Sequence, residues 1–297
     1  MRCLVLLSLA LLGVLSCQRA SAQERLAAVA TFSILGDMVA RVGGEDVEVT
    51  TLVGPEGDAH VYQPTPADAA VVAKARIVFE NGLGLEGWLG RLIRSSGYKG
   101  VVVTMIRDVE TLGGHGAAVL GAPDPHAWQS LANALVYVRN TKDGLCRVDQ
   151  ARCPHYAANA GAYAAEIGAL DAEIRSRIAA IPADRRKVIT SHDAFGYFGR
   201  AYGVTFLAPQ GLSTESEPSA RDVARLIQQI RQERVKALFI ENITDPRLVE
   251  QIARETGVKL GGTLYSDALS GRGGPAATYL DMMRHNAKAI VDALTCC

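Results

Sequence analysis

The sequence has few aromatic residues, no excess of charge of either sign and, beyond its first residues, no long apolar run. Phe, Trp and Tyr make up 6% of the 297 residues, and 31 Lys and Arg balance 31 Asp and Glu. Basic stretches interleaved with aromatics are absent, so nucleic acid is not an expected partner. Past the N-terminus no segment approaches the ~18 uninterrupted apolar residues of a membrane-spanning helix. We therefore expect the mature protein to be soluble or tethered to a membrane, without crossing it.

Signatures of common enzyme classes are also missing. The chain has no H-E-x-x-H, no G-x-S-x-G and no G-x-x-x-x-G-K-S/T sequence. The glycine-rich stretch "GLGLEG" lacks the spacing of a dinucleotide-binding loop. These absences favour a binding protein over an enzyme.

The first 22 residues have the pattern of a signal peptide. Arg2 precedes the apolar run "LVLLSLALLGVL", and the small residues "ASA" stand just before Gln23. The pattern predicts export to the periplasm and cleavage after Ala22. The box "VLSC" offers a second outcome, in which Cys17 is lipidated and anchors the chain. We favour simple cleavage because the A-x-A match is cleaner.

Cysteines are scarce in the mature chain, which keeps Cys146, Cys153, Cys296 and Cys297. No C-x-x-C pair occurs, so a metal site built from thiolates is not expected. Cys146 and Cys153 are seven positions apart across a polar stretch, which suits a disulfide that closes a surface loop in an exported protein. The partners of Cys296 and Cys297 cannot be read from the sequence.

Short β-rich runs alternate with amphipathic helical patterns in both halves, which is typical of α/β lobes with parallel sheets. Between the halves, residues 154–181 have a helical pattern rich in Ala, Glu and Arg, with Pro154 at its start and Pro182 after its end. At ~1.5 Å per residue this helix is about 40 Å long, enough to join two lobes rigidly. An ordinary surface helix is the alternative. The expected organisation is a signal peptide (1–22), an N-terminal lobe (23–150), a linking helix (151–182) and a C-terminal lobe (183–297).

Two of the six histidines lie in nearly the same hexapeptide. "DAHVYQ" at 58–63 and "DPHAWQ" at 124–129 both read Asp, any residue, His, any residue, aromatic, Gln, and each begins a predicted helix. A histidine in such a loop is held by its neighbours yet accessible, which suits a metal ligand. His60 and His126 are therefore candidate ligands from the N-terminal lobe.

The C-terminal lobe offers two further candidates. His192 follows the strand pattern "KVIT", and Asp267 is the only acid in "GGTLYSDALSG". Both stand where parallel strands end, the edge at which such sheets bind ligands. Three imidazoles and one carboxylate suit a tetrahedral zinc ion between the lobes. Four protein ligands leave no position for a reactive water, which argues against hydrolysis.

The remaining polar candidates either have two possible roles or are not expected to belong to the metal site. His115 in "GGHGAA" is either an accessory residue that captures metal or simply solvated. Glu80 either supports a ligand from behind or is a strand-end acid bonded to a loop. His155 and His285 lie in predicted helices and are expected at the surface. Asp193 should point to the opposite face of its strand from the neighbouring histidine, so it is not expected to orient that ring.

Several stretches together resemble one known family. They are "GDAHVYQPTPAD", "NGLGLEGWL", "DPHAW", "SHDAFGYFGRAYG", "STESEPSARDV", "FIEN" and "TLYSDALS", in this order over about residues 27–294. As a set they are similar to the zinc-specific periplasmic solute-binding proteins of ABC importers, the metal-binding cluster A-I. The resemblance implies two (β/α) lobes joined by one long rigid helix, with the metal in the cleft. It also implies that the ligands of Zn²⁺ are His60, His126, His192 and Asp267.

The resemblance implies a partner as well, an ABC permease in the inner membrane that receives the zinc. Manganese-binding members usually carry Glu at the position of His192, so this histidine favours zinc. The loop before His126 is shorter than in many zinc-binding members, so a periplasmic metallochaperone is a second route by which metal could arrive. We expect a monomer that captures zinc at neutral pH with deprotonated imidazoles. The alternatives are a manganese- or iron-binding or adhesin-like lipoprotein of the same fold, and a secreted zinc hydrolase.

Overall fold

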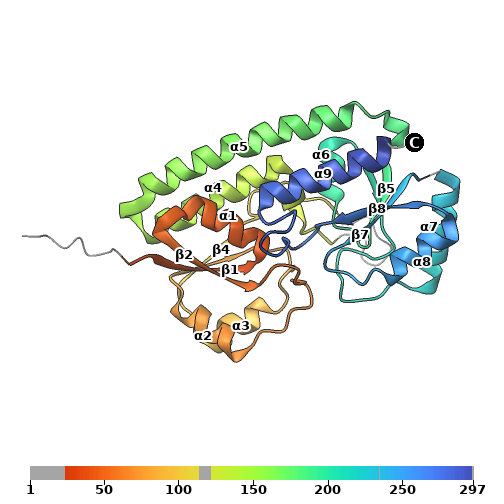
Figure 1. Cartoon of the computed structure of the whole chain (residues 1–297). Helices are drawn as coiled ribbons and strands as arrows, with labels where there is room; N and C mark the ends of the chain where they lie inside the picture. The colour runs from red at the N-terminus through yellow and green to blue at the C-terminus, as the bar shows by residue number, and fades with distance from the viewer. Residues whose placement is uncertain (1–23, 114–121, 234, 296–297) are drawn as a thin grey trace, which may run out of the picture.

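The protein consists of two α/β lobes spanned by one long helix (Figure 1). The computed structural model describes residues 24–113, 122–233 and 235–295. The predicted signal peptide, together with Cys17, His115, Cys296 and Cys297, lies outside these residues. The predicted architecture of two parallel-sheet lobes joined by a long helix is confirmed.

The N-terminal lobe is built on a parallel sheet in the order β2-β1-β3-β4. Its central strands are buried apolar runs, as expected where helices cover both faces of a parallel sheet. The strands are β1 (Leu26–Phe32), β2 (Val47–Val53), β3 (Ile77–Glu80) and β4 (Val101–Thr104). The helices are α1 (Ser33–Gly43), α2 (Pro66–Lys74), α3 (Leu89–Ser96) and α4 (Leu131–Val148).

The C-terminal lobe repeats this topology with the order β6-β5-β7-β8. In both sheets the strand order reverses beside the first strand, and ligands bind such sheets at the carboxyl ends of the strands near that point. The strands are β5 (Lys187–Ile189), β6 (Thr205–Leu207), β7 (Ala237–Glu241) and β8 (Lys259–Leu264). The helices are α6 (Gly196–Tyr202), α7 (Ala220–Glu233), α8 (Arg247–Thr256) and α9 (Tyr279–Thr295).

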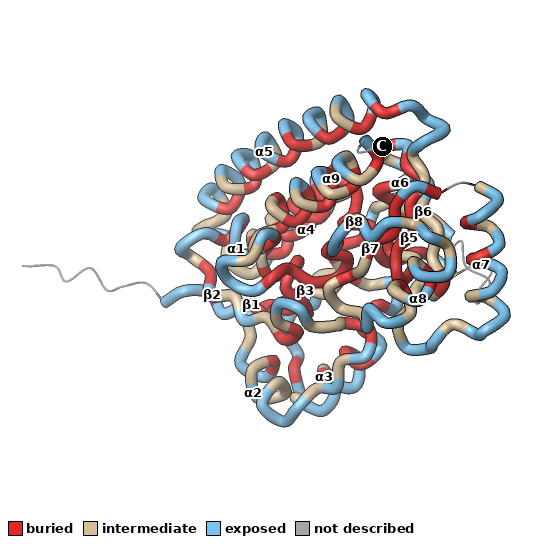
Figure 2. The backbone as a smooth tube through the Cα atoms, turned by 45° about the vertical axis from the view of Figure 1, so that its right-hand side comes forward, coloured by how far each residue is buried: buried red, intermediate tan, exposed pale blue. Residues whose placement is uncertain are grey.

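Two helices tie the lobes together. α5 (Cys153–Ala179) packs on α1 and α4 of the first lobe and on α6 of the second. One stripe along it is buried, at every third or fourth residue (Figure 2): Tyr156, Ala160, Tyr163, Ile167, Leu170, Ile174 and Ile178. α9 runs beside α5 and also contacts α1, so the C-terminal segment reaches back to the first lobe (Figure 1). α5 and α9 thus pack against each other and against elements of both lobes.

The joint between α4 and α5 differs from the sequence prediction in one respect. α4 continues to Val148, and Gly144 lets it lie close to the sheet: a Cβ there would come within 2.7 Å of Val103 Cγ2. Cys146 in the last turn of α4 forms the predicted disulfide with Cys153, the first residue of α5. The disulfide therefore staples a tight helix–helix joint, where an open surface loop was expected.

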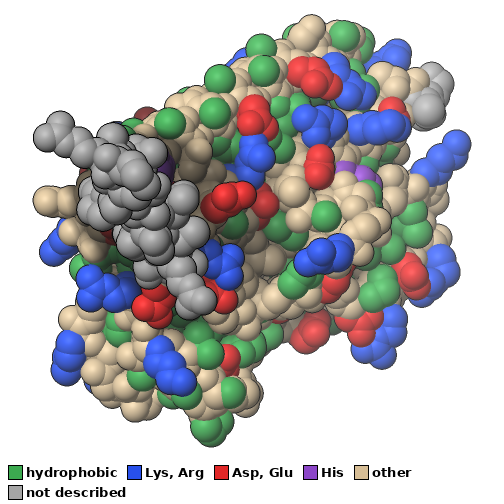
Figure 3. All heavy atoms as spheres, turned by 60° about the vertical axis from the view of Figure 1, so that its left-hand side comes forward, with side chains coloured by type: hydrophobic (Ala, Val, Ile, Leu, Met, Phe, Trp, Pro, Cys, Tyr) green, Lys and Arg blue, Asp and Glu red, His purple; other side chains and the backbone are tan. Residues whose placement is uncertain are grey.

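The surface is mixed in charge. On the face seen in Figure 3, acidic and basic side chains are interspersed, in keeping with a formal net charge of zero. The described side chains on that face do not form the continuous basic area that a polyanion would need. Within the described residues, no helix has the length and apolarity needed to cross a membrane.

Candidate metal site

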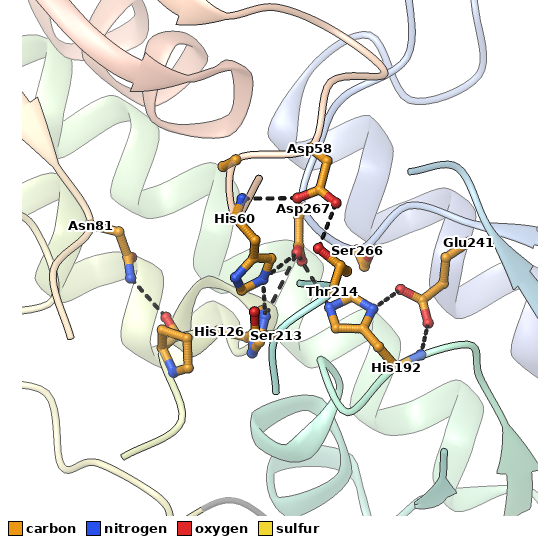
Figure 4. Close-up of polar contacts among 12 residues, drawn as sticks. Asp58, His60, Asn81, His126, His192, Ser213, Thr214, Glu241, Ser266 and Asp267 are labelled. Carbon is orange, nitrogen blue, oxygen red and sulfur yellow. Dashed lines mark hydrogen bonds and ion pairs between the residues drawn. The ribbon is translucent and has the colours of Figure 1, made fainter. Parts of the chain in front are cut away.

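Four buried side chains meet between the two lobes (Figure 4). His60 lies in the loop after β2, and His126 precedes a short 3₁₀ turn that leads to α4. His192 follows β5, and Asp267 follows β8. One donor atom from each lies within 4.8 Å of the others. The fold thus brings together the four residues that the sequence singled out from distant segments.

The spacing of the donor atoms suits one tetrahedral ion. Asp267 Oδ2 lies 3.1 Å from His60 Nε2, 3.3 Å from His192 Nε2 and 3.7 Å from His126 Nε2. The Nε2 atoms of His60 and His126 are 3.3 Å apart. Metal–ligand bonds of ~2.0–2.1 Å in a tetrahedron place the donors about 3.3 Å apart. The other carboxylate oxygen, Asp267 Oδ1, has no hydrogen-bond partner among the described residues. These four distances and the donor types therefore fit one tetrahedral metal ion.

A carboxylate fixes the ring of His126 from behind. Asp124 Oδ1 accepts a hydrogen bond from the backbone N–H of His126 at 2.9 Å and lies 2.8 Å from its ring Nδ1. A carboxylate at Nδ1 orients the ring, directs Nε2 at the site and makes it a more basic ligand. On the other side, Asn81 Nδ2 donates to the carbonyl oxygen of Pro125 at 2.9 Å (Figure 4). The turn that carries His126 is therefore held by two separate contacts.

Glu86 anchors the same network in the core of the first lobe. Its carboxylate accepts hydrogen bonds from Thr31 Oγ1 and from the backbone N–H of Asn81, both at 2.7 Å. Burial raises the pKa of Glu86 to about 7, because the charged carboxylate loses its hydration. Sequence reasoning assigned Glu86 no role. The structure shows that it orders the loop whose Asn81 touches the His126 turn.

Glu241 supports His192 as Asp124 supports His126. Its Oε1 accepts a hydrogen bond from the backbone N–H of His192 at 2.8 Å, and its Oε2 lies 2.5 Å from the ring Nδ1. Sequence reasoning missed Glu241. The available signal was an acid at the end of β7, the strand that pairs with β5 and so ends beside His192.

Side chains from each lobe also hold backbone of the other lobe near the site. Trp128 Nε1 and Gln129 Nε2 donate to the carbonyl oxygen of Ser266 at 2.9 and 2.7 Å. Ser266 immediately precedes the carboxylate ligand. In the opposite direction, the Tyr197 hydroxyl on α6 donates to the carbonyl oxygen of Asp124 at 2.9 Å. These contacts fix the relative position of ligands that come from different lobes.

The carboxylates around the site raise the pKa of two of its histidines. Burial favours a lower pKa for His126, but the charges of Asp267 and Asp124 outweigh it and raise the pKa to about 9. At His192 burial is likewise outweighed, and Glu241 and Asp267 raise the pKa well above its ordinary value. Burial acts to raise the pKa of Asp267, but the two imidazolium groups hold it well below its usual range. A metal ion binds deprotonated imidazoles, so its binding should displace any proton that these two rings carry.

The other residues considered from sequence lie outside this cluster. Glu80 Oε1 accepts a hydrogen bond from Thr104 Oγ1 at 2.7 Å, and its support of a ligand stays a prediction. His155 is exposed, with its ring Nδ1 2.8 Å from Asp46 Oδ2. His285 is half-buried on α9, with Nε2 3.0 Å from a carbonyl oxygen of β8. His115 lies outside the described residues, so its role also stays a prediction.

Comparison with known proteins identifies a family with these features. The chain matches the family described as "ZnuA: Zinc-uptake complex component A periplasmic" over residues 28–293. It is 32% identical over 272 residues to the manganese-binding lipoprotein MntA of Halalkalibacterium halodurans, covering 92% of this chain and 89% of that protein. It is 33% identical over 268 residues to the iron-binding protein YfeA of Yersinia pestis, covering 90% and 86%.

A solved structure shares both the fold and much of the sequence. The periplasmic zinc binding protein TroA from Treponema pallidum superimposes with a TM-score of 0.85 and 32% identity, over 91% of this chain and 99% of that one. The family match covers nearly all the described residues, including the four clustered side chains. The chain therefore belongs to the ZnuA-like family of periplasmic metal-binding components of ABC importers.

Proposed function

We propose that the protein captures Zn²⁺ between its lobes and hands it to an ABC permease in the inner membrane. The proposed ligands are His60, His126, His192 and Asp267. The observation that carries the proposal is the buried cluster of three imidazoles and one carboxylate, whose donor atoms all lie within 4.8 Å of one another. Four protein donors around one ion leave no position for a reactive water, so the site suits holding an ion and not hydrolysis.

The choice of zinc rests on the chemistry of the donors. Manganese prefers harder oxygen ligands and more of them, whereas a nitrogen-rich tetrahedral set suits zinc. His192 is decisive in this respect, because a carboxylate in its place would make the set half oxygen. Relatives are named as manganese-, iron- or zinc-binding, so membership of the family does not by itself select the metal. A manganese- or iron-binding protein of the same fold is the alternative.

We further propose that residues 1–22 are removed on export and that the mature chain works as a monomer in the periplasm. The alternative is lipidation of Cys17, which is favoured by the word lipoprotein in the name of MntA. The intact mass of the mature protein separates the two outcomes, since one chain begins at Gln23 and the other at an acylated Cys17. Loading by a metallochaperone and capture by His115 stay predictions.

Replacement of His192 by Ala tests the ligand set. Loss of one of four ligands should weaken zinc binding by more than about 100-fold, since even residues behind a ligand are worth ~10–100-fold. Competition with a chelator of known affinity measures the change. His285→Ala, at a histidine outside the cluster, is the matched control and should bind as the unmodified protein does. Unchanged affinity in His192→Ala would overturn the ligand set.

Metal identity needs a separate measurement. Protein purified without added metal should contain close to one zinc per chain by elemental analysis. Manganese or iron at that stoichiometry would replace zinc as the proposed cargo and favour the alternative.

A further inference from the structure

Three of the four proposed ligands are held firmly. His126, His192 and Asp267 have no exposed area. The side chains that fix them or the adjacent backbone are Asp124, Glu241, Trp128 and Gln129. These three ligands and their supports form one packed unit that contains segments from both lobes.

His60 is held differently. Among the described residues, its ring has hydrogen-bond contacts only with other proposed ligands, Asp267 and His126, and none at Nδ1. His60 also lies nearer to solvent than the other three ligands. It is 6% exposed, and the next residue, Val61, is 47% exposed. A cavity of about 790 Å³ between the lobes has His60, and none of the other three ligands, among its described lining residues. The His60 side is therefore the open side of the site.

One carboxylate joins the loop that carries His60 to the other lobe. Asp58 Oδ1 accepts a hydrogen bond from the backbone N–H of His60 at 2.8 Å. Asp58 Oδ2 accepts a hydrogen bond from the Thr214 hydroxyl at 2.6 Å (Figure 4). Thr214 lies in the segment 209–219, most of which lines the cavity. The two oxygens of Asp58 thus connect the ligand loop of one lobe to the cavity wall of the other.

The segment that carries Thr214 is itself tied to the strand end that bears His192. Gln210 Nε2 donates to the carbonyl oxygen of Thr214 at 3.2 Å, and Gln210 forms a β-bridge with His192. The backbone N–H of Asp193 donates to the carbonyl oxygen of Gly211 at 3.2 Å. The segment that carries Thr214 is therefore bonded to the backbone around His192, one of the three firmly held ligands.

We propose that the Asp58–Thr214 hydrogen bond is a latch that holds His60 over the bound metal ion, so that metal enters and leaves on the His60 side. This inference rests on the proposed metal site. Asp58 and Thr214 are positioning residues, because they act on the His60 loop and supply no donor to the cluster. When the latch opens, the His60 loop parts from the segment 209–219 and the other three ligands stay in place. The ion is then released from three ligands instead of four.

Substitution of Thr214 by Val tests the latch, because it removes the hydroxyl at nearly constant size. We expect zinc to transfer from the full-length mature protein to an excess of chromogenic chelator about 10-fold faster, the factor that corresponds to a hydrogen bond to a charged group. Thr214→Ser keeps a hydroxyl and should release zinc at nearly the unmodified rate. Thr205→Val, at an exposed threonine on β6, is the matched control. Thr214→Ala serves as a second hydroxyl-free variant.

The outcomes separate the latch from the metal site and from folding. In the metal-free variants the equilibrium constant for unfolding should rise by no more than about 10-fold, the effect of losing this one hydrogen bond. A larger loss of stability with an unchanged release rate would show a structural role alone and would overturn the latch. If the unmodified protein binds one zinc and both hydroxyl-free variants release it at the unmodified rate, the latch is overturned and the proposed function stands. If the unmodified protein binds no zinc, both proposals fail.

Discussion

The two hexapeptides at 58–63 and 124–129 share a pattern but differ in what surrounds them. In each, the Asp carboxylate accepts the backbone N–H of the histidine two residues later, at 2.8 and 2.9 Å. This turn is local chemistry that the Asp–x–His sequence itself provides. The next contact differs: Asp124 also lies against the ring of its own histidine, whereas Asp58 reaches Thr214 in the other lobe.

The aromatic and glutamine positions diverge in the same way. Trp128 and Gln129 are buried and bond to backbone of the second lobe. Tyr62 is half-buried with its ring against Trp88, and Gln63 is exposed. The same pattern thus gives a firmly held histidine where the second lobe covers it and a loosely held one where solvent and a cavity adjoin it. Local sequence sets the turn, and tertiary packing sets how firmly the ligand is held.

Matched changes at the two aspartates should have the largest unequal effect. Asp124→Asn removes the charge behind the His126 ring and should weaken zinc binding by about 10–100-fold. Asp58→Asn should weaken it by at most about 10-fold, because among the described residues Asp58 bonds to the backbone of His60 and to its latch partner, and to no ligand ring. Chelator competition measures both. Equal losses of zinc affinity in the two variants would contradict the claim that His126 is held more firmly than His60.

Matched changes at the two glutamines should separate the hexapeptides by stability. Gln129→Ala removes a buried side chain and a hydrogen bond to Ser266, so the free energy of unfolding should fall by about 2 kcal/mol. Gln63→Ala, at an exposed position, should change it by less than about 0.5 kcal/mol. Denaturant titration of the metal-free proteins gives both values. A neutral Gln129→Ala would mean that this inter-lobe contact does not stabilise the fold.

The smallest expected difference between the two hexapeptides concerns how the stability of the fold depends on pH. The pKa of His126 is about 9 in the folded, metal-free protein against an ordinary 6.5, so the folded state holds this proton more tightly than the unfolded chain. The resulting stability is fully present below pH 6.5 and is lost as the pH rises through 9.

Substitutions at Asp124 and at Asp58 should change the pH dependence of stability unequally. Asp124→Asn removes one cause of the raised pKa and should reduce the loss of stability by about 1 kcal/mol. Asp58→Asn should leave the loss unchanged. Unfolding of the metal-free proteins at several pH values tests this, and identical slopes in the two variants would contradict it.

Sequence patterns predicted those features of the fold and of the site that depend on neighbouring residues or on the ends of strands. The alternation of strands and helices predicted both lobes, and the prolines at 154 and 182 bracketed α5 to within a few residues. His192 and Asp267 could be placed at one edge because each follows a parallel strand. The repeated hexapeptide marked the other two clustered histidines because it is a local pattern.

Partners from distant segments were harder to assign: Glu241 was a candidate as an acid at the end of β7, but no local pattern linked it to His192. Glu241 lies 49 positions from His192, and the bond from Gln129 to Ser266 spans 137 positions. Neither pair shares a motif or a periodicity, since only the packing of neighbouring strands and lobes brings it together. The unequal support of the two hexapeptide histidines has the same origin: it depends on which part of the second lobe covers each one.

Anomalous diffraction at the zinc absorption edge tests the central claim most directly, using crystals of protein purified without added metal. We predict a single zinc peak bonded to His60, His126, His192 and Asp267 in a tetrahedron, with no water on the ion. Absence of zinc, a peak bound by other residues, or an ion at these four residues that also carries waters would contradict the account.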